Sequence, residues 1–254
     1  MKNILITICG RAGSKGFKNK NQKTFLGHPL VYYTVEIARD FRKRMRADCD
    51  VTICLNTDSS ELEKLVIQRY DDIEIIQRSP ELAGDKIAKM AVWHNSLDIL
   101  EQRLAKKYDY VIDLDITSPL RQIDDVINAY KEKIKREDCE LIYSVCESRR
   151  NPYFNMVKVQ NGFSTKFAHS DFTTRQEAPS VYDMNASIYV INADYLRNDK
   201  DNMLLNAKSY IYEMFDTAVL DIDSEHDFEL MEIVAKYLFE KHKNFQKVYD
   251  LMGV

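Results

Sequence analysis

The run Ile4-Leu5-Ile6-Thr7-Ile8-Cys9 leads directly into residues 10–21, GRAGSKGFKNKN, and the fold is indicated by this junction. The run is apolar or β-branched without alternation, which is typical of a strand covered on both faces of a sheet. The loop combines basic side chains with glycines, which permit positive φ and close approach of backbone N–H groups to an anion. We therefore expect a nucleotide or another phosphorylated ligand at the end of a first strand.

Two familiar phosphate loops do not match this segment. The glycine spacing is G-x-x-G-x-x-G, whereas the dinucleotide fingerprint requires G-x-G-x-x-G and the Walker loop requires G-x-x-x-x-G-K-[ST]. A tight turn with a solvated basic edge remains an alternative for the loop taken alone. The mismatch makes an NAD-dependent oxidoreductase an inferior hypothesis.

Beyond the loop, short apolar runs alternate with amphipathic stretches, which predicts an α/β fold with a mainly parallel sheet and right-handed crossovers. Ligands then collect at the carboxyl ends of the strands. We expect one domain over residues 1–254. The predicted strands are 3–9, 51–55, 73–76, 110–115 and 141–146, and the predicted helices are 29–44, 60–70, 85–105 and 123–136.

This alternation stops between residues 149 and 184, where Pro, Asn, Tyr and Phe become frequent. Strand-like patches at 154–159 and 164–168 predict an inserted hairpin lobe. Strands are expected again at 187–191, 209–213 and 218–222. A closing helix begins near Glu225, with Ser224 and Asp227 as its capping box.

Composition limits the class of protein. The chain has 254 residues, 45% hydrophobic and 30% charged, with a net charge of −4, so we expect a globular protein that binds no nucleic acid. The five cysteines include no C-x-x-C pair, which favours a reducing cytoplasm. No apolar stretch approaches the roughly 18 residues of a membrane span, so no membrane partner is expected.

Two acidic pairs carry the candidate chemistry. Asp113 and Asp115 share one face of an apolar strand and need a cation, a metal or emergence at the strand end. Asp115 is the better functional candidate, and Asp113 fits a paired structural acid. Asp221 and Asp223 offer two hard oxygen ligands suited to Mg²⁺, although ordinary strand-end polarity is the better explanation for this pair taken alone. Thr117 and Ser118 follow Asp115 and are expected to line the same cleft.

Six segments in the same order resemble the acylneuraminate cytidylyltransferase family, the CMP-nonulosonate synthetases. They are residues 10–21 (GRAGSKGFKNKN), 26–30 (LGHPL), 56–58 (NTD), 78–83 (RSPELA), 115–121 (DITSPLR) and 221–223 (DID). The resemblance covers nearly the whole chain. It implies a Rossmann-like, three-layer nucleotidyltransferase fold and a cytidylyltransferase that joins CMP from CTP to a nine-carbon α-keto acid sugar with Mg²⁺.

The resemblance also implies roles for individual residues. Nucleotide-binding residues would be Arg11, Ser14, Lys15, Asn21, Arg78, Thr117 and Ser118. Sugar-binding residues would be Asp115, Arg175, Gln176 and Asn185. The metal would be held by Asp221 and Asp223, and catalysis would involve Arg11, Lys15, Asp115 and Asp223. The lobe at 149–184 would exchange across a homodimer.

One departure concerns the substrate. The family pattern L-Q-P-T-S-P-L-R becomes residues 114–121, LDITSPLR, so Asp115 replaces a glutamine that contacts sugar. Residues 149–155 and 182–187 look more like the branch that activates legionaminic acid, while sialic and pseudaminic acids remain alternatives. The role of Asp115 as base, second metal ligand or sugar contact stays open. A sugar-1-phosphate nucleotidyltransferase and a non-catalytic nucleotide-binding scaffold are the rival functions.

Overall fold

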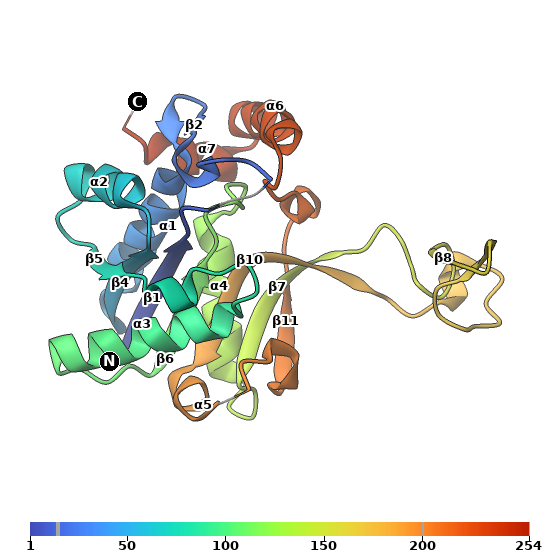
Figure 1. Cartoon of the computed structure of the whole chain (residues 1–254), viewed down its shortest axis with the longest axis horizontal. Coiled ribbons are helices and arrows are strands. Elements are labelled where there is room, and N and C mark those ends of the chain that lie inside the picture. The colour runs from blue at the N-terminus through green and yellow to red at the C-terminus, as the bar shows by residue number, and fades with distance from the viewer. Residues whose placement is uncertain (14–15, 200, 254) are drawn as a thin grey trace.

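The computed structural model describes residues 1–13, 16–199 and 201–253 of the chain. A central sheet lies between two layers of helices, and an extended lobe projects from one edge (Figure 1). The three-layer α/β fold predicted from the sequence is therefore confirmed.

The sheet has seven strands in the order β11-β7-β10-β6-β1-β4-β5. Parallel pairing joins β1 to β4 and β6, β4 to β5, and β7 to β11. Only β10 runs antiparallel to its neighbours, β6 and β7. The strands are β1 (Lys2–Gly10), β4 (Cys49–Thr57), β5 (Glu74–Gln77), β6 (Tyr110–Leu114), β7 (Leu141–Glu147), β10 (Tyr182–Asn192) and β11 (Ser209–Glu213).

The helices divide between the two faces of the sheet. The larger core includes side chains of α1, α2, α4, α6 and α7, and the smaller core includes those of α3 and α5. Successive residues of β1 serve both cores, since Ile4, Ile6 and Ile8 belong to the larger and Leu5 to the smaller. The helices are α1 (Leu30–Met45), α2 (Ser60–Arg69), α3 (Lys89–Leu104), α4 (Ile123–Lys135), α5 (Ala193–Asn198), α6 (Glu225–Lys241) and α7 (Lys243–Asp250).

Several local features follow from specific residues. The short strands β2 (Thr24–Phe25) and β3 (His28–Pro29) form a hairpin whose turn residues, Leu26 and Gly27, take φ of 43° and 90°. The predicted capping box of α6 is confirmed, because the Ser224 hydroxyl accepts from the Asp227 N–H and the Asp227 carboxylate accepts in return. The five cysteines all lie in the described part of the chain and are free.

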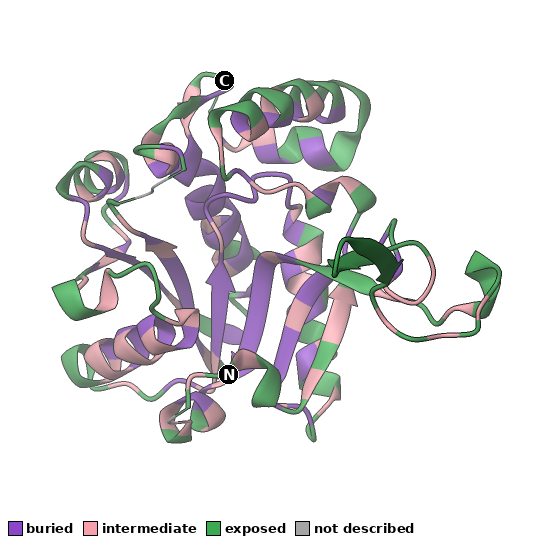
Figure 2. Ribbon diagram, turned by 45° about the vertical axis from the view of Figure 1, so that its right-hand side comes forward, coloured by how far each residue is buried: buried purple, intermediate pink, exposed green. Residues whose placement is uncertain are grey.

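The lobe leaves the sheet after β7 and returns through β10, two adjacent strands. Its hairpin pairs β8 (Val157–Gln160) with β9 (Phe163–Lys166), and every residue of both strands is exposed. Figure 2 shows buried strands in the body and mainly exposed residues in the lobe. The chain also contains the 3₁₀ turns η1 (Lys20–Gln22), η2 (Pro80–Leu82), η3 (Arg175–Glu177), η4 (Leu204–Asn206) and η5 (Asp216–Val219).

One predicted element is wrong, and one predicted helix begins later than expected. The strand predicted at 218–222 is instead the turn η5 followed by an extended segment, whose Ile222 N–H bonds to the Thr117 carbonyl rather than to a strand. The third helix begins at Lys89 and not at Asp85, because the residues before it form a loop without a capping side chain. In the structure, both segments place polar residues at the carboxyl edge of the sheet. Among residues 1–13, 16–199 and 201–253, no helix has the length and apolar character needed to cross a membrane.

Candidate active site

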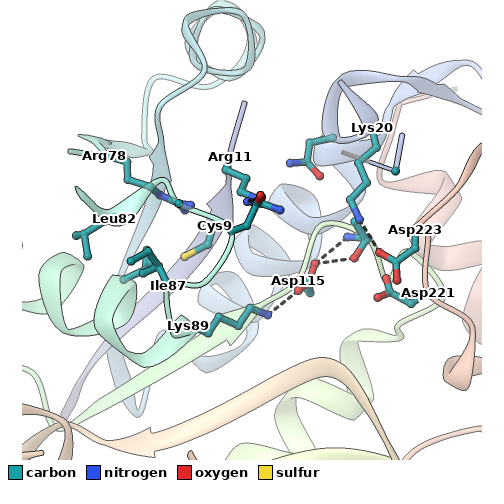
Figure 3. A pocket seen from close by; sticks show the side chains of 16 residues that line it. Cys9, Arg11, Lys20, Arg78, Leu82, Ile87, Lys89, Asp115, Asp221 and Asp223 are labelled. Atoms are coloured by element: carbon teal, nitrogen blue, oxygen red, sulfur yellow. Dashed lines mark hydrogen bonds and ion pairs between the residues drawn. The ribbon is translucent and has the colours of Figure 1, made fainter. Parts of the chain in front are cut away.

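A cavity of about 710 Å³ opens at the carboxyl ends of the central strands. Figure 3 shows Arg11 and Arg78 on one side of it and Lys20, Asp221 and Asp223 on the other. Its volume is that of a pocket for a sizeable small molecule. The lining residues are Cys9, Arg11, Gly16, Lys20, Asn21, Arg78, Leu82, Gly84, Asp85, Ile87, Lys89, Val92, Asp115, Thr117, Asp221 and Asp223.

The basic loop is fixed by two acids from other segments. The guanidinium of Arg11 forms an ion pair with Asp85, and the backbone N–H of Ala12 donates to Asp58 Oδ1 at 2.8 Å. Asp58 immediately follows β4, so the loop is anchored to the neighbouring strand end. Ser14 and Lys15, the two remaining residues predicted to hold phosphate here, lie outside the described residues.

The glycines of this loop act through size. Positive φ was the expectation, but in the described part of the chain glycine takes it only at positions 27, 162 and 253. A Cβ at Gly10 would stand 2.5 Å from Leu62 Cδ2, and one at Gly16 would stand 2.6 Å from a backbone oxygen. Close packing, rather than left-handed backbone, therefore favours glycine at both positions, and most strongly at Gly16, where the contacted atom belongs to the backbone.

Lys20 and Asn21 follow the loop in η1. The ammonium of Lys20 donates to the Ile222 carbonyl at 2.6 Å and to Asp223 Oδ1 at 3.0 Å. Asn21 is buried and lines the cavity. The N-terminal loop and the acidic segment near the end of the chain are thus joined across the cavity.

Arg78 stands just beyond β5 and is held by Asn56. Its Nε donates to Asn56 Oδ1 and its Nη2 to the Asn56 carbonyl, both at 2.8 Å. The two bonds fix the plane of the guanidinium. A planar donor in a fixed orientation suits a planar ligand with acceptor atoms at its edge.

The carboxylate of Asp115 lies just after the end of β6 and is saturated on one oxygen. Its Oδ1 accepts from the Thr117 N–H at 3.0 Å and from the Thr117 hydroxyl at 2.9 Å, while its Oδ2 lies 2.5 Å from the ammonium of Lys89. Burial would raise the pKa of Asp115, but the Lys89 charge and the Thr117 bonds outweigh burial and hold that pKa well below its usual range. Asp115 is therefore a fixed carboxylate.

Asp113 is the buried partner within the same strand. Its Oδ1 accepts from the Thr7 hydroxyl at 2.8 Å, and its Oδ2 lies 3.2 Å from the Lys89 ammonium. Burial lowers the pKa of Lys89, but attraction to Asp115 and Asp113 prevails and raises it well above the ordinary value. Asp113 is therefore a buried, paired acid, whereas Asp115 lines the cavity and its functional role stays a prediction.

A fully buried arginine supports the loop that carries Asp115 and Thr117. Arg121 donates to the carbonyls of Asp115, Ser118 and Ser187 and, at 3.2 Å, to a threonine hydroxyl of α1. Burial lowers its pKa to about 10, so the side chain stays charged near neutrality. Its role is to hold the loop from the interior.

Asp221 and Asp223 both line the cavity and stand on either side of buried Ile222. Burial first, and then the charge of Asp115, raises the pKa of Asp221. Within the described ranges 1–13, 16–199 and 201–253, no three His, Cys, Asp or Glu side chains gather as a metal-binding group. Two hard oxygen donors beside a basic loop still fit Mg²⁺, which takes one or two carboxylates and completes its octahedron with water and phosphate oxygens.

Four predicted site residues are not brought to this cavity within one chain. The Ser118 hydroxyl is buried 3.5 Å from the Asn185 carbonyl, and the Asn185 amide is occupied in the interior, where its Oδ1 accepts from Ser144 at 2.6 Å. Arg175 and Gln176 lie in η3 of the exposed lobe. Their sugar- and nucleotide-binding roles stay predictions.

Lys89 and Asp85 were missing from the predicted site. The requirement for a cation beside the strand carboxylates pointed toward a residue such as Lys89, but could not select it among the chain's 36 basic residues. Lys20 was noted only as part of the loop's charge. Its bond to Asp223 spans 203 positions, which no local pattern reveals.

The profile of the cytidylyltransferase family matches residues 5–251. The post-translational flagellin modification protein B of Campylobacter coli is 35% identical over 96% of this chain and 100% of that protein. The CMP-N,N′-diacetyllegionaminic acid synthase of Campylobacter jejuni is 36% identical over the same shares. A solved CMP:2-keto-3-deoxy-manno-octonic acid synthetase in complex with CTP has a TM-score of 0.65 at 13% identity, covering 92% of this chain and 99% of that one, which shows a shared fold.

The family match spans nearly the whole chain, and the cavity contains the residue types that nucleotidyl transfer needs at the place where this fold binds ligands. The expectation from the sequence is thereby confirmed: the chain belongs to the cytidylyltransferase family, in the enzyme class of the CMP-sugar acid synthetases.

Proposed function

We propose that this protein transfers CMP from CTP to the anomeric hydroxyl of a nonulosonic acid of the legionaminic type, releasing pyrophosphate. One observation carries the proposal: the basic loop, the fixed arginine after β5 and the acidic pair near the end of the chain meet in a single cavity. The two relatives that are 35–36% identical carry names for flagellin modification and for a CMP-N,N′-diacetyllegionaminic acid synthase. A CMP-pseudaminate or CMP-sialate product would use the same arrangement.

The basic side of the cavity is proposed to bind the nucleotide. Arg11, with Ser14 and Lys15, neutralises the triphosphate, and Asn21 contacts the nucleoside. Arg78 meets the edge of cytosine, because its guanidinium is already oriented by Asn56. In a phosphoryl-type transfer, such positioning and charge neutralisation provide most of the rate enhancement.

Asp221 and Asp223 are proposed to hold Mg²⁺, which supplies positive charge to the phosphate oxygens when bound. The Lys20 ammonium contacts Asp223 and the neighbouring carbonyl, so it orients this carboxylate. Arg11 and Lys15 stabilise the negative charge that grows toward the leaving pyrophosphate.

Asp115 is proposed to accept a hydrogen bond from the sugar. A general base works best with a pKa near the operating pH, whereas the cation and hydrogen bonds around Asp115 keep its pKa far below neutrality. This argument disfavours the role of base that the sequence left open. Its second oxygen still has acceptor capacity, which suits a hydroxyl or amide of the acceptor sugar.

A homodimer is proposed to complete the site. The lobe exposes large apolar side chains, with Val159 75% and Phe163 77% exposed, and such surface usually marks an interface. Packing of the lobe on a second copy would bring Arg175 and Gln176 to the neighbouring cavity, which they do not reach in their own chain.

The test is pyrophosphate release with CTP, Mg²⁺ and a panel of acceptors: N,N′-diacetyllegionaminic, N-acetylneuraminic and pseudaminic acids and 3-deoxy-octulosonate. UTP and ATP serve as nucleotide controls. The proposal expects the highest kcat/KM with CTP and the legionaminic acceptor. A preference for N-acetylneuraminic acid would overturn the substrate assignment, and no release with any acceptor would overturn the function.

A further inference from the structure

Lys89, the first residue of α3, lines the cavity and has no role in the nucleotide or metal contacts proposed above. Figure 3 shows its side chain extending toward Asp115. Its ammonium lies 2.5 Å from Asp115 Oδ2, 3.2 Å from Asp113 Oδ2 and 5.0 Å from the centre of the Tyr189 ring. Lys89 is thus held by two carboxylates and an aromatic face from neighbouring strands.

Hydrogen-bonding capacity remains on the cavity side of this cluster. Asp115 Oδ1 is used by Thr117, and the single contact on Oδ2 leaves one further lone pair there. The Lys89 ammonium has three donors, of which two are directed at carboxylates. The Lys89 side chain is 33% exposed and the Asp115 side chain is 19% exposed, and both residues line the cavity, so a ligand in the cavity can approach this pair.

The charge of the cluster selects the kind of ligand. The carboxylates of Asp113 and Asp115 are balanced by the Lys89 ammonium and the buried Arg121 guanidinium, so the cluster has no excess positive charge to attract a triphosphate or the carboxylate of a sugar acid. An uncharged group that offers an N–H donor beside a carbonyl acceptor matches the cluster in charge and in hydrogen bonding. A secondary amide has this pattern.

We propose that Lys89 and Asp115 act together as a specificity-determining pair that binds an N-acetyl substituent of the acceptor sugar. Asp115 Oδ2 accepts from the amide N–H, and Lys89 donates to the acetyl carbonyl. Lys89 also positions Asp115, because the ammonium fixes the orientation of the carboxylate. This inference rests on the proposed function and assigns the pair to the acceptor rather than to CTP.

The test compares KM for the acceptor with KM for CTP in the full-length enzyme, using N,N′-diacetyllegionaminic acid and Mg²⁺. Lys89→Met is expected to raise the acceptor KM on the order of 10- to 100-fold, the loss of a charge-assisted hydrogen bond, with the CTP KM within about twofold. Lys89→Arg retains the donor and is expected to recover most of the acceptor affinity. Lys86→Met, an exposed lysine three residues earlier, is the matched control and should match the wild type.

Removing the ammonium leaves two carboxylates facing each other, so Lys89→Met is paired with the double variant K89M/D115N, which removes one of these charges as well. The double variant should show a rise in acceptor KM at least as large, and it provides this readout even if the single variant fails to fold. The inference is overturned if the variants have an unchanged acceptor KM, or if their CTP KM rises equally. In either case, turnover by the wild type would still uphold the proposed function. A wild type that activates no sugar acid overturns both.

Discussion

Gly16 lies so close to Asp223 that a Cβ at position 16 would stand 2.6 Å from the Asp223 backbone oxygen. The two residues are 207 positions apart in the sequence, and their contact sets the distance between the basic loop and the acidic pair. Any residue with a Cβ at position 16 would require one of the two backbone segments to move.

This contact predicts that Gly16→Ala displaces the acidic segment from the loop and lowers kcat/KM about 10- to 100-fold, because small misplacements at a reacting centre are costly. The measurement is steady-state pyrophosphate release together with a thermal melt. Gly13→Ala is the control, since a Cβ there meets nothing within 4 Å. Equal activity of the two variants would contradict the role assigned to the contact.

Asp223→Ala is expected to abolish turnover and leave the fold intact. The carboxylate is 80% exposed and its ion pair with Lys20 is worth little to stability, so unfolding should change by less than about 0.5 kcal/mol. Loss of a hard oxygen ligand should also weaken the Mg²⁺ dependence of CTP binding. Glu229→Ala, which removes an exposed carboxylate on α6, provides the comparison. Near-normal turnover in folded Asp223→Ala would rule out the metal assignment.

Arg121→Met is expected to destabilise the protein by about 3–5 kcal/mol, because it leaves buried carbonyls of the loop without donors. Urea unfolding measures the loss. Arg103→Met is the control: Arg103 pairs with Glu74 at the surface, and its removal should cost less than about 1 kcal/mol. A small change for Arg121→Met would mean that water replaces the guanidinium in the interior.

Glu101 predicts a pH-dependent contribution to stability. Burial opposes its charge, but Arg197 and the Tyr108 N–H prevail and lower the pKa of Glu101. Because the folded-state pKa is lowered, the Glu101 carboxylate stabilises the protein at pH values above its unfolded pKa of about 4.3. This stabilisation is lost as the pH falls through the folded-state pKa. Glu101→Gln should therefore cost about 1–3 kcal/mol near neutral pH and progressively less below about pH 4. Urea titrations at several pH values test this, and a pH-independent difference would contradict it.

The exposed lobe predicts that Phe163→Ser weakens self-association. If Phe163 packs against a second copy, sedimentation should show a shift from dimer toward monomer and a parallel loss of activity, because Arg175 and Gln176 leave the neighbouring site. Ile233→Ser, on the exposed face of α6 and 69% exposed, is the apolar control outside the lobe. A wild type that sediments as a monomer at enzymatic concentrations would refute the dimer.

The sequence predicted most of the body because β1 and the amphipathic helices have patterns that only a covered sheet satisfies. It did not predict the antiparallel insertion of β10 between β6 and β7, since a buried strand has the same pattern in either direction. Residues 218–222 were mistaken for a strand because a short, mostly apolar run also fits a 3₁₀ turn followed by an extended segment.

For the site, the order of the motifs along the chain pointed to five residues that line the cavity: Arg11, Arg78, Asp115, Asp221 and Asp223. Each of them stands in a loop that follows a strand or a turn, where the sequence leaves a recognisable polar segment. Lys89 and Lys20 contribute through pairings between distant segments, and such pairings depend on tertiary packing. The sequence could state that Asp115 needed a cation, but only the fold identifies which one.

The residues that line the cavity come from positions 9 to 223, almost the full length of the chain. During synthesis the arginines at 11 and 78 emerge early, whereas the acidic pair emerges only after the lobe has been made. A product terminated within the lobe would carry the basic half of the site and neither acidic residue. We therefore expect a chain that ends within the lobe to have no transferase activity.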